Sequence, residues 1–336
     1  MDIREVSVIG AGAWGSALAL HISKNGVKVT LWAYEKEVVD EINQKNMNSA
    51  FLPGFDFDAG IRATADIAEA CKNRMIFFVV PSHVVEGVLA RMLPNLNIDS
   101  IIVSATKGIE NEKLRLPSQI LEERLPAAAA QKLVCLAGPS FAKEVAAGLP
   151  TAITAASKDK ESAVAVQQLL SGERMRVYTH DDVMGVELGG AVKNVISIAA
   201  GISDGMGLGL NARAAIITRG VAEMKRLGKK MGAVETTFSG LSGVGDLILT
   251  ATGDLSRNRT VGKRLGAGEK IEEITSGMKA VAEGVLTSRS IFRLSKNFGV
   301  DLPVCREVYL VCHEGKNPKD AVKTLMAREL KDEFHG

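Results

Sequence analysis

The sequence predicts an α/β protein with two domains, a mostly parallel, doubly wound sheet followed by an all-helical domain. Short apolar segments alternate with helical segments up to about residue 180, an order typical of parallel sheets covered by helices. Beyond that point the strand patterns stop and long amphipathic segments take their place. We therefore place the domains at residues 1–185 and 186–336.

Composition excludes several classes of protein. The 336 residues are 24% charged with a net charge of +2 and no long basic run, so nucleic acid is not an expected partner. No uninterrupted apolar stretch reaches about 18 residues, and no membrane span is expected. The first residues lead directly into a strand pattern, which leaves no room for a signal peptide. Four scattered cysteines without a Cys-x-x-Cys pair indicate reduced thiols in a cytoplasmic protein, and the five histidines show no metal-ligand spacing, so no metal is expected.

The first element is a strand at residues 5–9 that ends in the motif Gly-Ala-Gly-Ala-Trp-Gly, residues 10–15. A helical segment follows at 16–24 and a second strand at 27–32. Strand, Gly-x-Gly-x-x-Gly, helix and strand within about 30 residues form the dinucleotide-binding fingerprint, which predicts a Rossmann-type domain.

Each glycine of the motif has an expected task. Gly10 makes the tight turn, Gly12 lets the backbone approach a pyrophosphate, and Gly15 lets the helix pack on the sheet. The pyrophosphate is expected at the helix N-terminus, where unpaired N–H groups face it. A purely structural turn is the alternative, because 33 glycines can produce such a hexamer by chance.

Further strands and helices follow this first unit in alternation. The expected strands are residues 75–80, 101–106, 133–137, 151–154 and 175–178, and the expected helices between them include 82–93, 116–124 and 162–170.

Three of these strands end in distinctive residues: Pro81-Ser82, Lys107-Gly108 and Gly138-Pro139-Ser140. Ligands of doubly wound sheets bind outside the carboxyl ends of the strands. Each group also has a structural interpretation, in which Pro81 only stops a strand, Gly108 only turns the chain and Ser140 only caps a helix at 141–147. A lysine at such an end, beside a dinucleotide loop, favours the functional interpretation.

In the second half, the helical segments are 182–202, 212–231, 282–298 and 303–313. The first of them is apolar on every side, with Glu187, Lys193, Asn194 and Ser197 as its only polar residues between 186 and 200. A lysine buried there must find a partner or lose its proton, unless its tip reaches solvent.

One loop region, residues 239–259, departs from this helical background. Its small residues would let the backbone come close to a ligand. Asp246 could hold the lysine or could simply cap a helix at Leu247. Ser256, Arg257 and Asn258 form a good donor set for a phosphate dianion, although a solvated surface is the alternative.

Together these blocks resemble the bacterial NAD(P)-dependent glycerol-3-phosphate dehydrogenases, over nearly the whole chain to about residue 330. The resemblance rests on the glycine motif, Pro81-Ser82, Lys107-Gly108, Gly138-Pro139-Ser140-Phe141-Ala142, Gly190-x-x-Lys193-Asn194, Asn211-x-Arg213, Gly243-x-Gly245-Asp246-Leu247 and Ser256-Arg257-Asn258. It implies reversible reduction of dihydroxyacetone phosphate to sn-glycerol 3-phosphate with NAD(P)H, for phospholipid synthesis.

The resemblance also implies roles for single residues. Lys193 is expected to donate and accept the proton, with Asp246 holding its ammonium and Lys107 as a neighbouring cation. The implied substrate ligands are Lys107, Gly138, Ser140, Lys193, Asp246, Ser256, Arg257 and Asn258. The implied cofactor ligands are Gly10, Gly12, Ala13, Trp14, Gly15, Tyr34, Lys107, Ala142, Arg257, Val281 and Glu283.

Two positions depart from the family pattern. Members often have serine at the position of Ala13, and often arginine or histidine where this chain has Ala33-Tyr34. An acidic residue that contacts the ribose is expected about 20 residues past the glycines, and Glu35 lies there, with Lys36 as the only nearby cation. NADH is therefore expected to serve at least as well as NADPH, although the sequence leaves the preference open.

Two other functions stay open at this point. A related 2- or 3-hydroxyacid dehydrogenase would need a carboxylate clamp in place of the phosphate clamp. A non-catalytic dinucleotide sensor would keep the glycine motif but would have no need of Lys193 or Asp246 in an apolar setting. The sequence does not fix the oligomeric state, for which a homodimer is the commonest arrangement.

Overall fold

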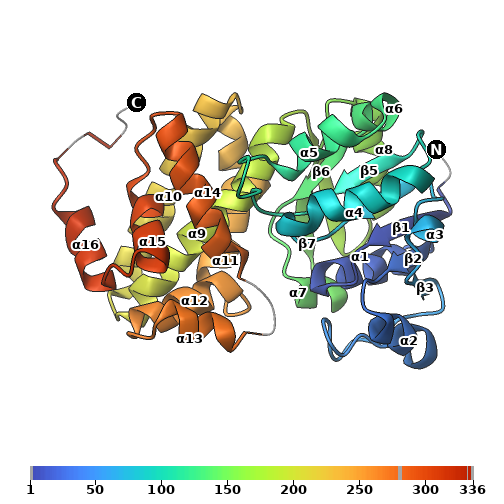
Figure 1. The fold of residues 1–336 in the computed structure, drawn as a ribbon, viewed down its shortest axis with the longest axis horizontal. Helices are drawn as coiled ribbons and strands as arrows, with labels where there is room; N and C mark the ends of the chain where they lie inside the picture. Colours follow the sequence, from blue (N-terminus) through green and yellow to red (C-terminus); the bar gives the residue numbers. More distant parts are fainter. Residues whose placement is uncertain (1–2, 279–281, 331, 334–336) are drawn as a thin grey trace. The chain divides into compact units, whose positions relative to one another are not determined.

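The computed structural model describes residues 3–278, 282–330 and 332–333. The chain divides into two compact units (Figure 1). The first unit contains residues 1–107 and 115–187, and the second contains 108–114 and 188–336. The boundary near residue 187 lies inside a helix, and the short segment 108–114 belongs to the second unit although the chain on both sides of it belongs to the first.

The first unit is built on an eight-stranded sheet in the order β3-β2-β1-β4-β5-β6-β7-β8. Neighbouring strands are parallel except β6 and β7, which are antiparallel. The predicted doubly wound, mostly parallel sheet is confirmed. The strands are β1 Glu5–Ile9, β2 Lys28–Trp32, β3 Ile61–Thr64, β4 Met75–Phe78, β5 Ile101–Ser104, β6 Val134–Ala137, β7 Thr151–Ala156 and β8 Met175–His180.

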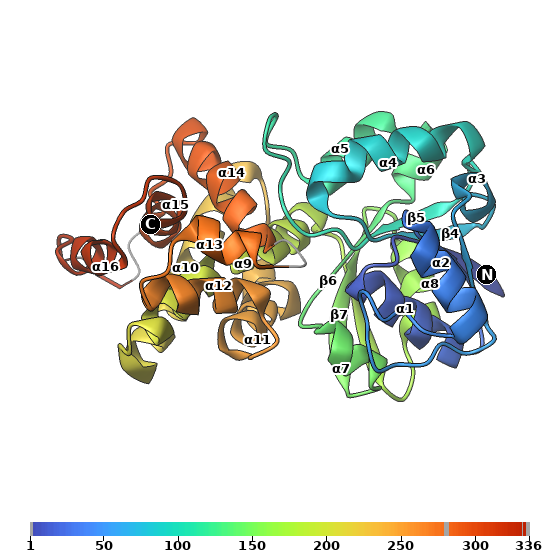
Figure 2. The ribbon, with the colours of Figure 1, turned by 60° about the horizontal axis from the view of Figure 1, so that its bottom comes forward.

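Each face of this sheet has its own apolar core, because alternate strand residues point to opposite sides. In β4, Met75 and Phe77 join the core that helices α1, α2, α7 and α8 cover. Ile76 and Phe78 join the other core, covered by α3, α4, α5 and α6 (Figure 2). The helices are α1 Ala13–Lys24, α2 Lys36–Lys45, α3 Ile67–Ala70, α4 Val85–Met92, α5 Pro117–Arg124, α6 Ala127–Gln131, α7 Ala142–Ala146 and α8 Lys160–Leu170, with short 3-10 helices at Ser82–Val84 and Leu93–Asn95.

The strand order places a topological switch point between β1 and β4, where the chain changes the direction in which it adds strands. In open sheets of this kind the dinucleotide binds in the crevice at such a point, outside the carboxyl ends. The glycine motif follows β1 and therefore lies at this switch point. Strand β3 was not anticipated from the sequence, because its four residues include the exposed Arg62 and form only a short apolar pattern.

The second unit is helical, as predicted, but the region 239–259, which was expected to be a loop, is largely helical as well. Its central element is α9, Val183–Gly205, whose first residues still belong to the first unit. This helix is long and apolar enough to cross a membrane by length and composition, and 94% of its most apolar window is buried inside the protein. The other helices are α10 Gly209–Met231, α11 Asp246–Thr252, α12 Arg257–Gly266, α13 Ile271–Ser276, α14 Glu283–Asn297, α15 Pro303–His313 and α16 Pro318–Met326, with a 3-10 helix at Glu235–Ser239 and a π-helix at Leu241–Gly245.

Helices α9 and α12 approach each other so closely that only glycine fits at their crossing. A Cβ on Gly201 would lie 2.9 Å from the Cα of Gly262, and a Cβ on Gly262 would lie 2.1 Å from the carbonyl oxygen of Ile198. One turn further, a Cβ on Gly205 would lie 2.1 Å from the carbonyl oxygen of Lys263. This contact of backbone on backbone fixes the start of α12 relative to the buried face of α9.

Candidate functional site

The glycine motif forms a tight turn that requires glycine at positions 10 and 15. Gly10 has φ +113°, and its N–H donates to the carbonyl oxygen of Trp32 at 3.0 Å. A Cβ on Gly15 would stand 1.9 Å from the carbonyl oxygen of Gly10, so the helix could not pack as it does. Gly12 is different, because a Cβ there would meet no atom within 4 Å. The space outside Gly12, at the N-terminus of α1, fits the approach of a pyrophosphate.

A buried asparagine from outside the motif holds this turn in place. Asn48, which is fully buried, donates from its side-chain amide to the carbonyl oxygen of Ala11 at 2.8 Å and to the hydroxyl of Ser16 at 2.9 Å. Ser16 also donates to Ala11 at 3.0 Å. The first turn of α1, which begins with Ala13 and Trp14, contains no acidic residue that would oppose an anion.

The other predicted site residues of the first unit follow parallel strands of the same sheet. They therefore lie at the carboxyl ends of the strands, as the glycine motif does. Lys107 comes after β5 and is half-buried. Gly138 comes after β6 with φ +140°, and Ser140 donates from its hydroxyl to the carbonyl oxygen of Gly138 at 3.0 Å. Ser140 does not cap the next helix, because Phe141 occupies the N-cap position before Ala142.

In the second unit, the structure brings Lys193 together with two side chains of α11. The Nζ atom of Lys193 donates to Oδ1 of Asp246 at 2.5 Å and to the hydroxyl of Thr250 at 2.8 Å. Lys193, Asp246 and Thr250 are 5%, 0% and 4% exposed. Lys193 and Asp246 are both withdrawn from water, so each charged group has the other as a partner in place of solvent.

Local structure explains how α11 presents this carboxylate. The helix begins at Asp246 itself, with Gly245 as its N-cap, so the capping role considered for Asp246 does not occur. A π-helical turn at Leu241–Gly245 precedes it, and a Cβ on Gly189 of α9 would lie 2.6 Å from the carbonyl oxygen of Ser242. Small residues on both elements therefore let the start of α11 come close to α9.

Thr250 is a residue that the sequence reasoning missed. Its hydroxyl donates to the carbonyl oxygen of Asp246 at 2.7 Å and accepts from Lys193. Residues four apart share one face of a helix. The spacing of Asp246 and Thr250 could therefore have indicated that both side chains contact Lys193. Asn48 was missed as well, because nothing local connects it to the glycine motif.

The three residues predicted to bind phosphate lie at the start of α12 and differ in their contacts. Ser256 is the N-cap, and its hydroxyl accepts from the backbone N–H of Arg259 at 3.2 Å. Asn258 donates to the Asn194 side chain at 2.9 Å and accepts from the backbone N–H of Gly284 at 2.9 Å. Arg257 is exposed and makes no hydrogen bond or ion pair with any residue that the structure describes. Of the three, Arg257 therefore has its donors available for a ligand.

The remaining predicted cofactor residues lie near the start of α14 or after β2. Glu283 is the first residue of α14 and is half-buried. Val281 lies outside the described residues. Tyr34 is 74% exposed and stands edge-on to Trp32, with ring centroids 6.4 Å apart.

A second ionisable residue of α9, Glu187, is buried against α5 and not at the Lys193 cluster. Glu187 is 3% exposed, and its carboxylate accepts from the backbone N–H of Ser118 at 3.0 Å and from the Ser118 hydroxyl. Burial raises the pKa of Glu187 to about 7, against the opposing effect of the Ser118 hydrogen bonds. Since Ser118 lies in the first turn of α5, Glu187 stabilises the start of that helix.

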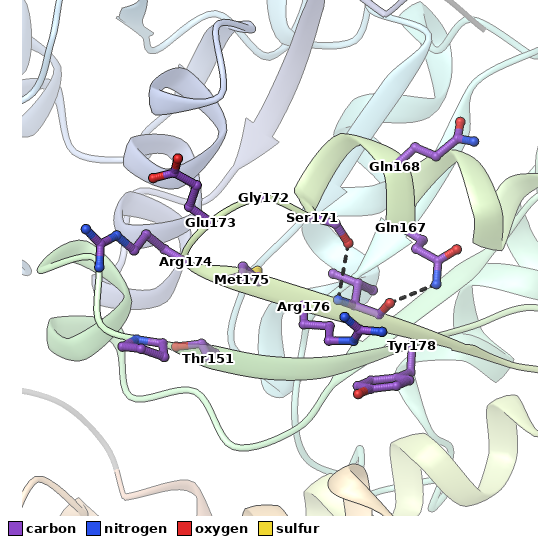
Figure 3. A pocket seen from close by; sticks show the side chains of 12 residues that line it. Thr151, Gln167, Gln168, Ser171, Gly172, Glu173, Arg174, Met175, Arg176 and Tyr178 are labelled. Atoms are coloured by element: carbon purple, nitrogen blue, oxygen red, sulfur yellow. Dashed lines mark hydrogen bonds between the residues drawn. The ribbon is translucent and has the colours of Figure 1, made fainter.

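A surface hollow of about 540 Å³ in the first unit lies beside the edge strand β8 and not at the glycine motif (Figure 3). Two side chains of its lining bind the backbone N–H and carbonyl oxygen of Val177 in this strand. The amide of Gln167 donates to the carbonyl oxygen of Val177 at 2.8 Å, and the hydroxyl of Ser171 accepts from its N–H at 3.3 Å. These side chains therefore occupy the backbone groups of Val177 that another strand would need. The hollow contains none of the predicted site residues.

Two further findings bear on the chemistry of the site. Among the described residues, no group of three or more His, Cys, Asp or Glu side chains is placed to hold a metal ion. The four cysteines are buried free thiols, and burial raises the pKa of Cys71 to about 11 and that of Cys312 to about 12, so neither is a ready nucleophile.

Comparison with known proteins agrees with this geometry. Residues 5–163 match the family model described as NAD-dependent glycerol-3-phosphate dehydrogenase N-terminus, and residues 182–323 match the one for the C-terminus. The chain is 52% identical over 330 residues, 98% of this chain and 99% of the relative, to a protein of Syntrophotalea carbinolica named glycerol-3-phosphate dehydrogenase [NAD(P)+].

Solved structures show the same likeness. The crystal structure of glycerol-3-phosphate dehydrogenase from Coxiella burnetii matches with a TM-score of 0.92 and 38% identity, covering 97% of this chain and 99% of that one. A ketopantoate reductase from Ralstonia eutropha matches with a TM-score of 0.61 at only 14% identity, over 95% of this chain and 99% of that one, and so shares the fold alone.

Proposed function

This chain belongs to the NAD-dependent glycerol-3-phosphate dehydrogenase family, and on that premise we propose how its residues perform the reaction. The protein is an NAD(P)-dependent oxidoreductase that interconverts dihydroxyacetone phosphate and sn-glycerol 3-phosphate. The observation that supports the mechanism best is the Lys193, Asp246 and Thr250 cluster, because it holds an ammonium ion in an almost fully buried setting.

The first unit fits the cofactor. The open space at Gly12 and the N-terminus of α1 suit a pyrophosphate, with Gly10, Ala13, Trp14 and Gly15 as neighbouring residues of the same turn. When bound, NAD(P)H supplies the hydride. The chain has to orient it and to exclude water, which we assign to the glycine turn together with Tyr34, Lys107, Ala142, Arg257, Val281 and Glu283.

Lys193 has the role of proton donor during reduction. Addition of hydride to a ketone leaves negative charge on its oxygen, and an ammonium within hydrogen-bond reach can transfer a proton to that oxygen. Asp246 and Thr250 hold Nζ in position for this transfer. In the reverse direction the neutral amine accepts the proton of the alcohol. Lys107 is proposed as an additional cation toward the oxygen or phosphate of the substrate.

The phosphate of the substrate is assigned to the start of α12. The first turn of this helix has no acidic residue, and its N-terminus favours an anion. Arg257 brings a planar guanidinium that makes no hydrogen bond or ion pair with the described residues. Ser256 and Asn258 are held by Arg259, Asn194 and Gly284, so they can present a fixed hydroxyl and amide. The family resemblance adds Gly138 and Ser140 to the proposed substrate ligands.

The alternative functions have less support. The ketopantoate reductase from Ralstonia eutropha shares the fold at 14% sequence identity, which supports a common fold but not a common substrate. A dinucleotide sensor does not need a buried ammonium that is paired with a carboxylate and a hydroxyl. From the activity we also infer a cytoplasmic location and a role in supplying glycerol 3-phosphate to phospholipid synthesis. A homodimer remains the commonest arrangement for such a chain.

One assay tests the proposed function directly. NADH or NADPH is mixed with the purified protein, and the absorbance of the reduced nicotinamide is followed on adding dihydroxyacetone phosphate, ketopantoate or a 2-keto acid. Oxidation with dihydroxyacetone phosphate alone is expected. Activity with a keto acid but not with the phosphate would favour the hydroxyacid alternative, and binding of NAD(P)H without oxidation by any of them would favour the sensor.

A further inference from the structure

An arginine from a distant part of the chain lies at the carboxyl end of β2. Arg91 of α4 places its guanidinium carbon 5.3 Å from the ring centroid of Trp32 and 5.9 Å from that of Tyr34. Trp32, the last residue of β2, is 2% exposed, whereas Tyr34 is 74% exposed. The guanidinium therefore lies over one buried and one open aromatic ring.

This position adjoins the glycine turn. Trp32 pairs with Ile9 in the register of β1 and β2, and its carbonyl oxygen accepts the N–H of Gly10 at 3.0 Å. In dinucleotide-binding sheets the end of the second strand faces the adenosine ribose, where an acid contacts the 2′-hydroxyl of NAD or an arginine accommodates the 2′-phosphate of NADP. Arg91 is the arginine that the structure brings to this end of the strand.

The donors of Arg91 are available to a ligand. The side chain is exposed and makes no hydrogen bond or ion pair within the described part of the chain. Contact with two aromatic rings restrains a guanidinium but leaves its N–H groups free to donate hydrogen bonds. A planar guanidinium can then donate two parallel hydrogen bonds to one phosphate. We propose that Arg91 binds the 2′-phosphate of NADPH beside Tyr34 and so makes NADPH a substrate at least as good as NADH.

This proposal rests on cofactor binding at the glycine turn, as proposed above, and it changes one expectation from the sequence. Glu35 and Lys36 were the only charged candidates near the end of β2. In the structure Glu35 is the N-cap residue of α2 and Lys36 is the first residue of that helix, and both are exposed. In this proposal the positive charge that binds the 2′-phosphate is the guanidinium of Arg91 in α4, which lies over Trp32 and Tyr34.

The test compares Arg91→Ala with Arg74→Ala. Arg74 is also exposed and lies in the first unit, but it directly precedes β4 and so stands at the opposite, amino end of that strand. Binding of adenosine 2′,5′-bisphosphate and of adenosine 5′-monophosphate is measured by calorimetry and by the fluorescence of the tryptophans, and kcat/KM is measured with NADPH and NADH. The two nucleotides differ only in the 2′-phosphate.

Arg91→Ala should weaken binding of the bisphosphate and lower kcat/KM for NADPH by roughly 10–100-fold, the usual worth of hydrogen bonds to a charged group. The monophosphate and NADH should change by less than about threefold, and Arg74→Ala should change neither. Arg91→Lys should recover part of the loss, since it restores the charge but not the fork.

Equal losses for both nucleotides, or no loss for either, would overturn the assignment of Arg91 to the 2′-phosphate. The proposed dehydrogenase function would stand in both cases, because reduction of dihydroxyacetone phosphate with NADH is measured in the same variants. The dehydrogenase function itself would be refuted by a different result, namely that the wild-type protein does not reduce dihydroxyacetone phosphate.

Discussion

The glycine turn of the first unit and the Lys193 cluster of the second are built from different parts of the polypeptide. The turn consists of backbone, with glycines at positions where a Cβ would collide with a carbonyl oxygen or fill the space outside α1. The cluster consists of side chains, namely an ammonium, a carboxylate and a hydroxyl held by two neighbouring helices. A substitution in the glycine turn should therefore distort the backbone. A substitution in the Lys193 cluster should instead remove a functional group.

This difference also explains what each site can tolerate. The turn works with alanine at position 13, because backbone N–H groups and not that side chain are expected to face the pyrophosphate. The cluster should have no such freedom, since in the proposed mechanism only a side chain that carries a transferable proton can replace Lys193. Four predictions test or sharpen the comparison.

The largest effect is expected from Lys193→Met, which keeps the volume and removes the proton. We expect kcat to fall roughly 10²–10⁴-fold while NAD(P)H still binds, with Lys229→Met on the surface of α10 as a control that changes neither. Steady-state kinetics and cofactor titration measure both. If the variant retains more than about a tenth of the wild-type kcat, another residue transfers the proton.

The structure adds a consequence for stability. Lys193→Met removes the ion pair that Lys193 makes with the carboxylate of Asp246, which is 0% exposed, and removing one ion of a buried pair costs on the order of 3–5 kcal/mol. The double variant Lys193→Met/Asp246→Asn should recover much of that loss in urea denaturation and none of the activity. Recovery of activity in the double variant would contradict the role of Lys193.

The next effect concerns the substrate phosphate. Arg257→Ala should lower kcat/KM for dihydroxyacetone phosphate by about 2–4 kcal/mol of transition-state binding, and Arg257→Lys should restore only part of it. Arg264→Ala is the matched control on the same helix, because Arg264 only pairs with Glu269 at the surface. Near-normal kinetics of Arg257→Ala would exclude Arg257 as a phosphate ligand.

A third prediction separates shape from binding within the glycine turn. Gly15→Ala places a Cβ 1.9 Å from the carbonyl oxygen of Gly10, so unfolding free energy should fall by about 3 kcal/mol. Gly12→Ala meets no atom, and its φ of −63° suits alanine, so stability should change by less than about 1 kcal/mol while cofactor affinity falls. Unchanged cofactor affinity in Gly12→Ala would place the pyrophosphate elsewhere.

The smallest effect is expected from Glu187, a buried acid of α9 that is held by backbone and hydroxyl groups of Ser118. Its folded-state pKa is raised from 4.5 to about 7, so the folded protein binds more protons than the unfolded chain between these values. This contribution to stability is fully present below pH 4.5 and is lost as pH rises through about 7. Urea denaturation from pH 4.5 to 8 should show a loss on the order of 2 kcal/mol in wild type.

Glu187→Gln is the control for that pH dependence. It removes the titrating proton and keeps an oxygen that can accept from Ser118, so the slope between pH 4.5 and 7 should be smaller. Activity should remain, in contrast to Lys193→Met, because Glu187 contacts only residues that build the fold. An unchanged slope in Glu187→Gln would assign the pH dependence to another group.

Much of the fold could be predicted from local patterns. The runs predicted at 5–9, 75–80 and 101–106 contain strands β1, β4 and β5, although β4 ends at Phe78 and β5 at Ser104. They could be predicted because they are apolar and short, and such runs alternate with helices in a parallel sheet. Lys193 stood out because an ammonium on an all-apolar helix needs a partner wherever that helix is buried. These features depend on residues that are close in sequence.

The tertiary structure alone decided which distant residues meet. The sequence contains no local signal that β7 runs antiparallel to β6, that residues 108–114 pack with the second unit, or that Asn48 supports the glycine turn. Thr250 joins Lys193 only because α11 packs against α9, and Arg91 reaches Trp32 only because α4 covers that face of the sheet. Periodicity fixes the faces of a helix or strand, whereas packing of the whole chain fixes which faces come together.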